Sequence, residues 1–200
     1  MAYNLLTDRL PDALTIGGKR YPIRTDFRRW ILVTELFAEN LADGKVKADC
    51  AAKLIFPAES PLDDLYGLSA AETGERYRTL IQAVTWFAVC GRMVRPAKNS
   101  SAGVQTEAVF DFTADAERIA AAFLQTYGID LCDPAVRLHF WKFMALLRNL
   151  PQETEFMRVV NLRMTDTAAI EDDEIRRRVR RARARVRLRT DNEEKENLYG

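Results

Sequence analysis

The sequence predicts a mainly α-helical protein, a single helical domain with a small N-terminal β-hairpin and a C-terminal arginine-rich helix. Three observations lead to this prediction. Apolar residues recur every three or four positions over several segments, which is the period of helices that bury one face. Strand-like residues flank a Gly-Gly pair at only one place, within residues 10–25. Nine arginines crowd residues 176–189 at helical spacing.

The hairpin is expected within residues 10–25, where Gly17-Gly18 can supply the positive φ angles of a tight turn. Its strand residues are apolar at Leu14, Ile16, Tyr21 and Ile23. Pro22 lacks a backbone N–H, so its strand is expected at an edge. Because an isolated hairpin is marginally stable in water, it must pack against helices.

Three helices are expected in the first half of the chain. The first runs from a cap at Thr25 or Asp26 to about Asn40, and a short second one covers 47–55. Prolines at 57 and 61 predict a loop over 57–68. A third helix follows over 69–90, with Tyr77, Leu80, Ile81, Val84 and Phe87 at the 3–4 spacing.

The second half predicts three more helices before the arginine-rich one. The first is capped at Thr113 and stopped by Gly128, and its apolar stripe is Ala116, Ile119, Ala120, Phe123, Leu124 and Tyr127. The second begins at Pro134 and ends before Pro151. The third covers 152–163 and turns Phe156, Val159 and Val160 inward.

The last helix is expected over roughly 171–189. Ile175, Val179, Ala182 and Val186 form a short seam with a 4, 3, 4 spacing. Residues 171–200 carry ten basic and eight acidic side chains. Three interpretations of the arginines stay open: a solvated face, a docking helix for an acidic or amphipathic protein, or a phosphate-binding helix. No base-reading motif accompanies them.

The expected organisation has three parts. Residues 1–25 hold the hairpin, 26–168 the helical domain, and 169–200 the arginine-rich helix with a disordered acidic tail. A Gly-, Pro- and Ser-containing stretch near 91–107 is expected to be a mobile linker. It joins two halves of one domain or two subdomains.

Composition limits the function classes. The net charge of +1 argues against a nucleic-acid partner, and no apolar run approaches the ~20 residues of a membrane span. The start of the chain lacks the features of a secretion signal, so a cytoplasmic location is expected. Cys50, Cys90 and Cys132 lie among apolar neighbours and are expected to be buried, reduced thiols.

No residues with the spacing of a catalytic, cofactor or metal site stand out, so we expect a protein that is not an enzyme. His139, the one histidine, has no nucleophile that spacing could pair with it, and a structural role is favoured. Asp63-Asp64 and Asp172-Asp173 lack the spacing of metal ligands. Phe140 and Trp141 are interpreted as core residues, with a groove for a partner helix as the alternative.

Several motifs together resemble the bacteriophage gene product fifteen family of long-tailed phages and prophages. They are Gly18-Lys-Arg-Tyr-Pro-Ile-Arg-Thr-Asp-Phe-Arg, Phe110-Asp-Phe, Asp115, Ala121-Ala-Phe, Tyr127-Gly-Ile-Asp-Leu, Leu138-His-Phe-Trp-Lys-Phe-Met-Ala-Leu and Arg163. The similarity covers roughly 10–40 and 108–190. Phe140 stands where the family often has a second tryptophan, which keeps an aromatic anchor.

The resemblance implies a non-enzymatic tail assembly chaperone of the host cytoplasm. Such a protein would bind the tape-measure protein and help recruit the major tail protein, whose subunits form the tail tube. Whether it forms homo-oligomers is left open. The partner-binding residues expected on this view are Phe140, Trp141, Ile175, Arg177, Val179, Arg181 and Val186. The rival functions are a nucleic-acid-binding phage protein that acts through the arginine-rich helix and a structural tail component.

Overall fold

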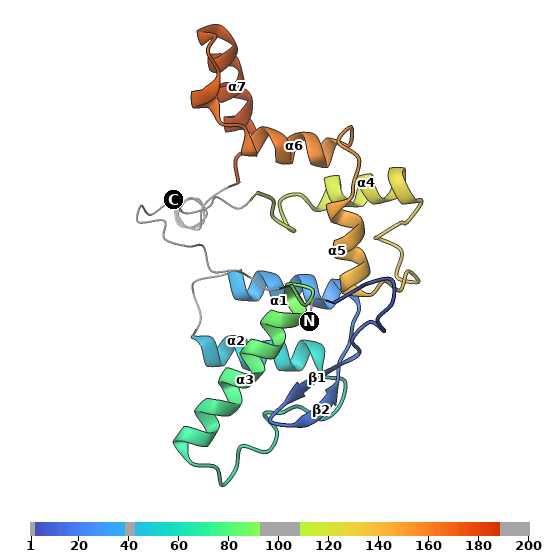
Figure 1. Cartoon of the computed structure of the whole chain (residues 1–200), viewed down its shortest axis with the longest axis vertical. Coiled ribbons are helices and arrows are strands. Elements are labelled where there is room, and N and C mark those ends of the chain that lie inside the picture. The colour runs from blue at the N-terminus through green and yellow to red at the C-terminus, as the bar shows by residue number, and fades with distance from the viewer. Residues whose placement is uncertain (1–2, 39–42, 93–108, 189–200) are drawn as a thin grey trace. The chain divides into compact units, whose positions relative to one another are not determined.

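The structure is a computed structural model that describes residues 3–38, 43–92 and 109–188. Within these ranges it is mainly helical, with seven α-helices, one short 3-10 helix and one two-stranded hairpin, as the sequence predicted (Figure 1). The elements are β1 Ala13–Ile16, β2 Lys19–Pro22, α1 Phe27–Ala38, α2 Gly44–Ile55, α3 Ala70–Ala88, α4 Ala116–Tyr127, α5 Phe140–Arg148, α6 Glu155–Met164, η1 Thr167–Ala169 and α7 Asp173–Arg185. The expected acidic tail and nearly all of the expected linker lie outside the described residues.

The chain forms two compact units, each of which is discontinuous in sequence. The N-terminal unit comprises Met1–Asn99 with Arg137–Ala145, and the C-terminal unit comprises Ser100–Val136 with Leu146–Gly200. The helix α5 therefore contributes its first two turns to one unit and its end to the other. The two units are described separately below.

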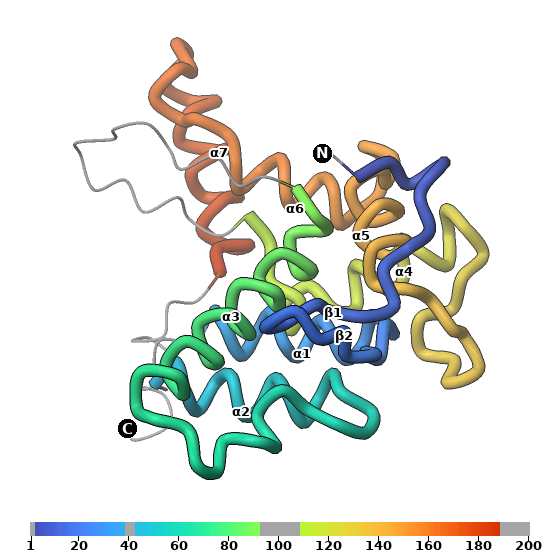
Figure 2. The backbone as a smooth tube through the Cα atoms, turned by 60° about the horizontal axis from the view of Figure 1, so that its bottom comes forward, coloured from blue at the N-terminus to red at the C-terminus, as the bar shows by residue number. Residues whose placement is uncertain are grey.

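The predicted hairpin is confirmed at the N-terminus. Strands β1 and β2 are antiparallel, with Leu14 opposite Tyr21, and Gly17 and Gly18 have φ angles of 58° and 79°. These angles lie in the left-handed region that such a two-residue turn needs. β1 packs on α3, as Figure 2 shows, and the side chains of Leu14, Ile16 and Tyr21 are buried.

Stacked aromatic rings form the core of the N-terminal unit. The ring of Trp30 on α1 lies 4.0 Å from that of Phe87 on α3, and Phe27 stacks on Phe143 at 4.9 Å. The indole N–H of Trp30 donates to the Arg24 carbonyl, and that of Trp141 donates to the Phe87 carbonyl, both at 2.8 Å. Each buried tryptophan therefore has a partner for its one polar atom.

The helix α5 begins six residues later than the predicted start at Pro134. The backbone N–H of Phe140 donates to the Thr25 carbonyl at 2.8 Å, and that of Phe27 donates to the Leu138 carbonyl at 3.0 Å. This isolated antiparallel bridge holds the chain extended before α5. A backbone pairing with a distant segment thus outweighs the local preference of proline for a helix start.

The C-terminal unit is built on the contact of α4 with α6. Ile119, Ala122 and Phe123 are the buried residues of α4, whereas Leu124 is 53% exposed. The predicted stripe is therefore rotated toward Ala122. The cap position is Asp115 and not the predicted Thr113, although the Asp115 side chain makes no cap hydrogen bond and its carboxylate is buried inside the unit.

The cysteines differ from the expectation. Cys50 and Cys132 are exposed and Cys90 is partly exposed, so the prediction of buried thiols is wrong. Apolar neighbours in sequence do not fix which side of the chain is buried.

Gly128 ends α4 in the left-handed conformation at a φ of 65°, as predicted. None of the helices described here is long and apolar enough to cross a membrane.

A glycine after α3 gives a stability prediction. The φ of Gly91 is +66°, and an added Cβ would lie 2.9 Å from the ring of Trp141. We expect Gly91→Ala to lower the free energy of unfolding by more than ~1 kcal/mol, measured by urea denaturation. Gly74, inside α3, is the matched control because its added Cβ would meet nothing within 4 Å. Gly74→Ala should stabilise by ~0.5–1 kcal/mol, and an equal effect of both substitutions would contradict this account.

Candidate functional site

His139 is a structural residue of the N-terminal unit. Its Nδ1 accepts a hydrogen bond from the Trp141 backbone N–H at 3.1 Å, so the ring proton lies on Nε2, which donates to the Pro11 carbonyl at 3.1 Å. Burial and the charge of Lys142 lower the pKa of His139, although the Pro11 carbonyl and Asp12 oppose them. Both ring nitrogens are occupied, which leaves neither for a substrate.

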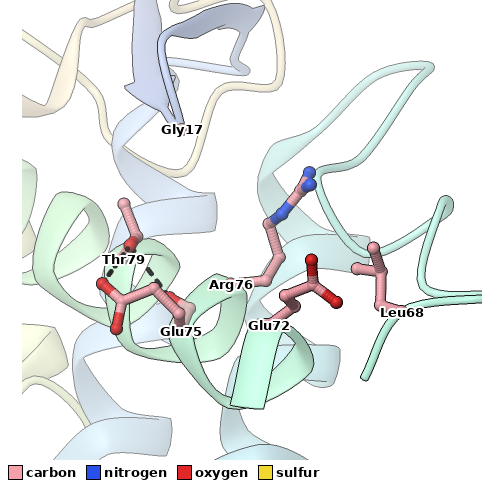
Figure 3. Close-up of a pocket in the computed structure, with 6 residues that line it drawn as sticks. All are labelled: Gly17, Leu68, Glu72, Glu75, Arg76 and Thr79. Atoms are coloured by element: carbon pink, nitrogen blue, oxygen red, sulfur yellow. Dashed lines mark hydrogen bonds between the residues drawn. The ribbon is translucent and has the colours of Figure 1, made fainter. Parts of the chain in front are cut away.

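Two shallow depressions lie on the N-terminal unit. The first, about 240 Å³, is lined by Gly17, Leu68, Glu72, Glu75, Arg76 and Thr79 (Figure 3). Glu72 is held there by the capping box of α3, since it accepts hydrogen bonds from the N–H and hydroxyl of Ser69. The second, about 340 Å³, lies between α2 and the loop at 56–63. Among the described residues no group of three or more His, Cys, Asp or Glu could hold a metal.

Phe140 and Trp141 are core residues of the N-terminal unit. Phe140 is fully buried and Trp141 is 1% exposed. Trp141 packs on Phe87, Trp86 and Tyr3 of its own unit. Aromatic side chains that stack on this many rings are withdrawn from solvent, which favours the core interpretation over the groove, and partner binding at these two residues stays an untested prediction.

The remaining candidates lie on α7, which is anchored at its start. The Asp172 carboxylate caps the helix by accepting from the N–H groups of Glu174 and Ile175 at 2.8 and 2.9 Å. Arg176 reaches back from the first turn, pairs with Asp173 at 2.5 Å and donates to the Ile170 carbonyl. These bonds satisfy backbone groups that a helix end leaves open.

Arg163 anchors the other end of α7. Its Nε donates to the Val186 carbonyl at 2.6 Å, just past the last helical residue. Its guanidinium forms a two-pronged pair with Asp115, at 2.6 Å from Nη1 to Oδ2 and 3.0 Å from Nη2 to Oδ1. The carboxylate of Asp115 is fully buried, and it also accepts from Arg118 and from the Asp111 N–H.

The pKa of Asp115 reflects this environment. Burial alone would raise it, but the hydrogen bonds from Arg163 and Asp111 and the charges of Arg163 and Arg118 outweigh burial and lower it. The pair therefore stabilises the folded unit above the unfolded pKa of ~3.9, and this contribution is lost as pH falls through the lower folded value.

Sequence reasoning noted both residues but did not pair them. A signal was present, because Arg163 continues the apolar stripe of Phe156, Val159 and Val160 at the i, i+3, i+4, i+7 spacing. A charge on a buried face requires a buried partner of opposite sign.

The outward side of α7 differs from the anchored side. Arg177, Arg178, Arg181 and Arg185, here called the basic face, are exposed and form no hydrogen bond or ion pair with a described residue. Ile175 is 53% exposed. Of the predicted partner-binding residues, Ile175, Arg177 and Arg181 are thus accessible, whereas Val179 and Val186 are half-buried.

Residues 6–188 match the family described as bacteriophage Gp15 protein. The chain belongs to that family. The match covers both units and all the elements described above, so the resemblance seen in the motifs of this Gp15 protein is confirmed. No curated protein and no solved structure matches it.

The Asp115–Arg163 pair leads to a mutational prediction. Arg163→Met leaves a buried carboxylate without its cation, and we expect a loss of ~3–5 kcal/mol in unfolding free energy. Hydrogen exchange of the α7 backbone amides should also become faster, because the Val186 carbonyl loses its donor. Arg118→Met is the control, since that side chain is 37% exposed and its loss should cost less than ~1 kcal/mol. Equal losses for the two variants would refute the central role of Arg163.

The single histidine provides a pH prediction. Because the folded pKa of His139 lies below the ordinary value of ~6.5, protons bind preferentially to the unfolded chain below that pH. Its contribution to stability is complete above ~6.5 and declines as pH falls toward the folded pKa. Urea unfolding at about pH 7.5 and about pH 5.5 measures this decline. His139→Asn keeps an acceptor for the Trp141 N–H and should remove most of the difference; an unchanged difference would assign it to another group.

Proposed function

We propose that this Gp15 protein is a non-enzymatic tail assembly chaperone of the infected host cytoplasm. It binds the tape-measure protein and helps recruit tail-tube subunits before the tube closes. Membership of the bacteriophage Gp15 family over residues 6–188 is the observation that carries the proposal. The accessible side of α7 supports it, because this side combines an apolar residue with cations that pair with no described residue, on a helix fixed at both ends.

The physical requirement for such a chaperone follows from its client. A tape-measure protein exposes long apolar helical stripes until the tube encloses it, and exposed stripes of that kind associate unless they are covered. A helical protein can cover them segment by segment. Each contact has to be weak and repeated, so that polymerising tube protein displaces the chaperone.

Nucleic-acid binding through α7 is the second candidate, and the basic face favours it. The four exposed arginines of this face could neutralise several phosphates. Glu174 lies on the same helix and opposes phosphate binding at its start. Salt separates the two functions, because phosphate binding releases counterions and falls steeply with ionic strength, while apolar contacts persist.

Co-expression with the tape-measure protein of the same phage tests the proposal. The tape measure should become soluble and co-purify after nuclease treatment at low salt and, in reduced amount, at high salt. A tape measure that stays insoluble, together with bound nucleic acid that salt removes, would establish the second candidate instead. An unrelated aggregation-prone coiled-coil protein serves as the control client and should remain insoluble.

A further inference from the structure

We propose that the basic face of α7 docks an acidic helix of the tape-measure protein, with carboxylates at positions i, i+4 and i+8. This inference rests on the proposed function and names the chemistry of the segment that is recognised. The basic face consists of Arg177, Arg178, Arg181 and Arg185, as defined above.

The orientation of the face is fixed by the anchored side of α7. Arg176 is bonded to the Ile170 carbonyl and Arg183 to the Thr165 carbonyl, while Arg163 holds the carbonyl of Val186. The helix contacts η1 and α6 through this side. Arg181 and Arg185 therefore point away from η1 and α6, since they lie about 140–180° from Arg176 and Arg183 around the axis, and Arg177 lies to the side of them, about 100–120° from Arg176 and Arg183.

The spacing of the face selects a helical partner. Arg177, Arg181 and Arg185 follow one another at four-residue intervals, which places their Cα atoms ~6 Å apart along the axis. A helix lying alongside presents carboxylates at the same pitch when they occupy i, i+4 and i+8. The planar guanidinium suits carboxylates because it can bond both oxygens at once.

Two neighbouring residues set the register of such a partner. Ile175 lies one turn before Arg178 and is 53% exposed, so it offers an apolar contact at one end of the face. Glu174 lies one turn before Arg177 and Arg178 and repels a carboxylate there, whereas Asp173 is engaged by Arg176. The partner therefore needs an apolar or basic residue at this end and acids toward Arg185.

The same features argue for a protein and against a nucleic acid. The face spans only about two helical turns, from 177 to 185, and no aromatic side chain lies on α7 to stack on a base. An apolar residue and an acid at one end suit an amphipathic helix better than a line of phosphates. The net charge of +1 adds no long-range attraction for nucleic acid.

The test uses the full chain and two synthetic helical peptides of about five turns. One carries Glu at i, i+4 and i+8 with a preceding Leu, and the other carries Gln in place of each Glu. Fluorescence anisotropy should show binding of the Glu peptide only. The triple variant Arg177→Gln, Arg181→Gln, Arg185→Gln should bind it about tenfold to hundredfold more weakly.

A matched control removes the same charge elsewhere. Lys53→Gln, Arg148→Gln, Arg158→Gln changes three exposed basic residues outside α7 and should leave the affinity unchanged. Equal weakening in both triple variants would reduce the effect to net charge and overturn the proposal. Tighter binding of duplex DNA than of the Glu peptide, lost in the α7 variant, would assign the face to nucleic acid and also overturn it.

A second set of variants tests whether the acidic segment of this chain at 191–196 occupies the basic face in place of a partner. If the wild type fails to bind the Glu peptide while Asp191→Asn, Glu193→Gln, Glu194→Gln, Glu196→Gln binds it, the chain's own segment occupies the face and the proposal fails.

Capture of the co-expressed tape measure distinguishes failure of this inference from failure of the proposed chaperone function. Equal capture by the wild type and the α7 variant would end this inference and leave the chaperone function intact. Binding of the Glu peptide without any capture would end both the chaperone function and the assignment of the tape-measure protein as the docked partner.

Discussion

The guanidinium of Arg163 joins three segments of the C-terminal unit that are distant in sequence. Its Nη1 and Nη2 donate to the buried carboxylate of Asp115 at the start of α4. Nη1 also donates to the Val109 carbonyl, and Nε donates to the Val186 carbonyl after α7. Because a buried carboxylate is stable only when it is paired and hydrogen-bonded, the positions of α4, α6 and the end of α7 depend on one another. Because the guanidinium of Arg163 is withdrawn from solvent and fixes the end of α7, the exposed arginines of that helix can present a defined surface.

The N-terminal unit uses a different constraint, in which backbone pairing precedes side-chain packing. The bridge of Asp26 with His139 sets the point where α5 begins, and the first turn of that helix then places Phe140 and Phe143 against Trp30 and Phe27. His139 completes the junction by capping α5 and bonding Pro11 at the same time. Neutral imidazole is the form that suits both contacts, so a residue type often associated with catalysis has a structural role in this unit.

Periodicity predicted the elements well where local signals decide them. α3 starts after Ser69 and α4 ends at Gly128 as expected, and Gly17-Gly18 makes the turn between Leu14 and Tyr21. Periodicity failed where contacts with a distant segment determine the structure. Neither the bridge that delays the start of α5 beyond Pro134 nor the rotation of α4 toward Asp115 has a local signature in the sequence. For the candidate surface, charge density located Arg177 and Arg181 on an exposed face, but an aromatic pair such as Phe140 and Trp141 could not be assigned to core or groove before its neighbours were known.

The interleaving of the two units in sequence has a consequence for the order of events on the ribosome. The N-terminal unit cannot complete its aromatic core until residues 137–145 have been made, and the C-terminal unit needs residue 186 for its last anchor. Trp30 and Phe87 therefore leave the exit tunnel well before Phe140 can cover them. Nascent chains in this interval expose apolar rings and are open to premature association, and neither unit can complete its folding until most of the chain has been made.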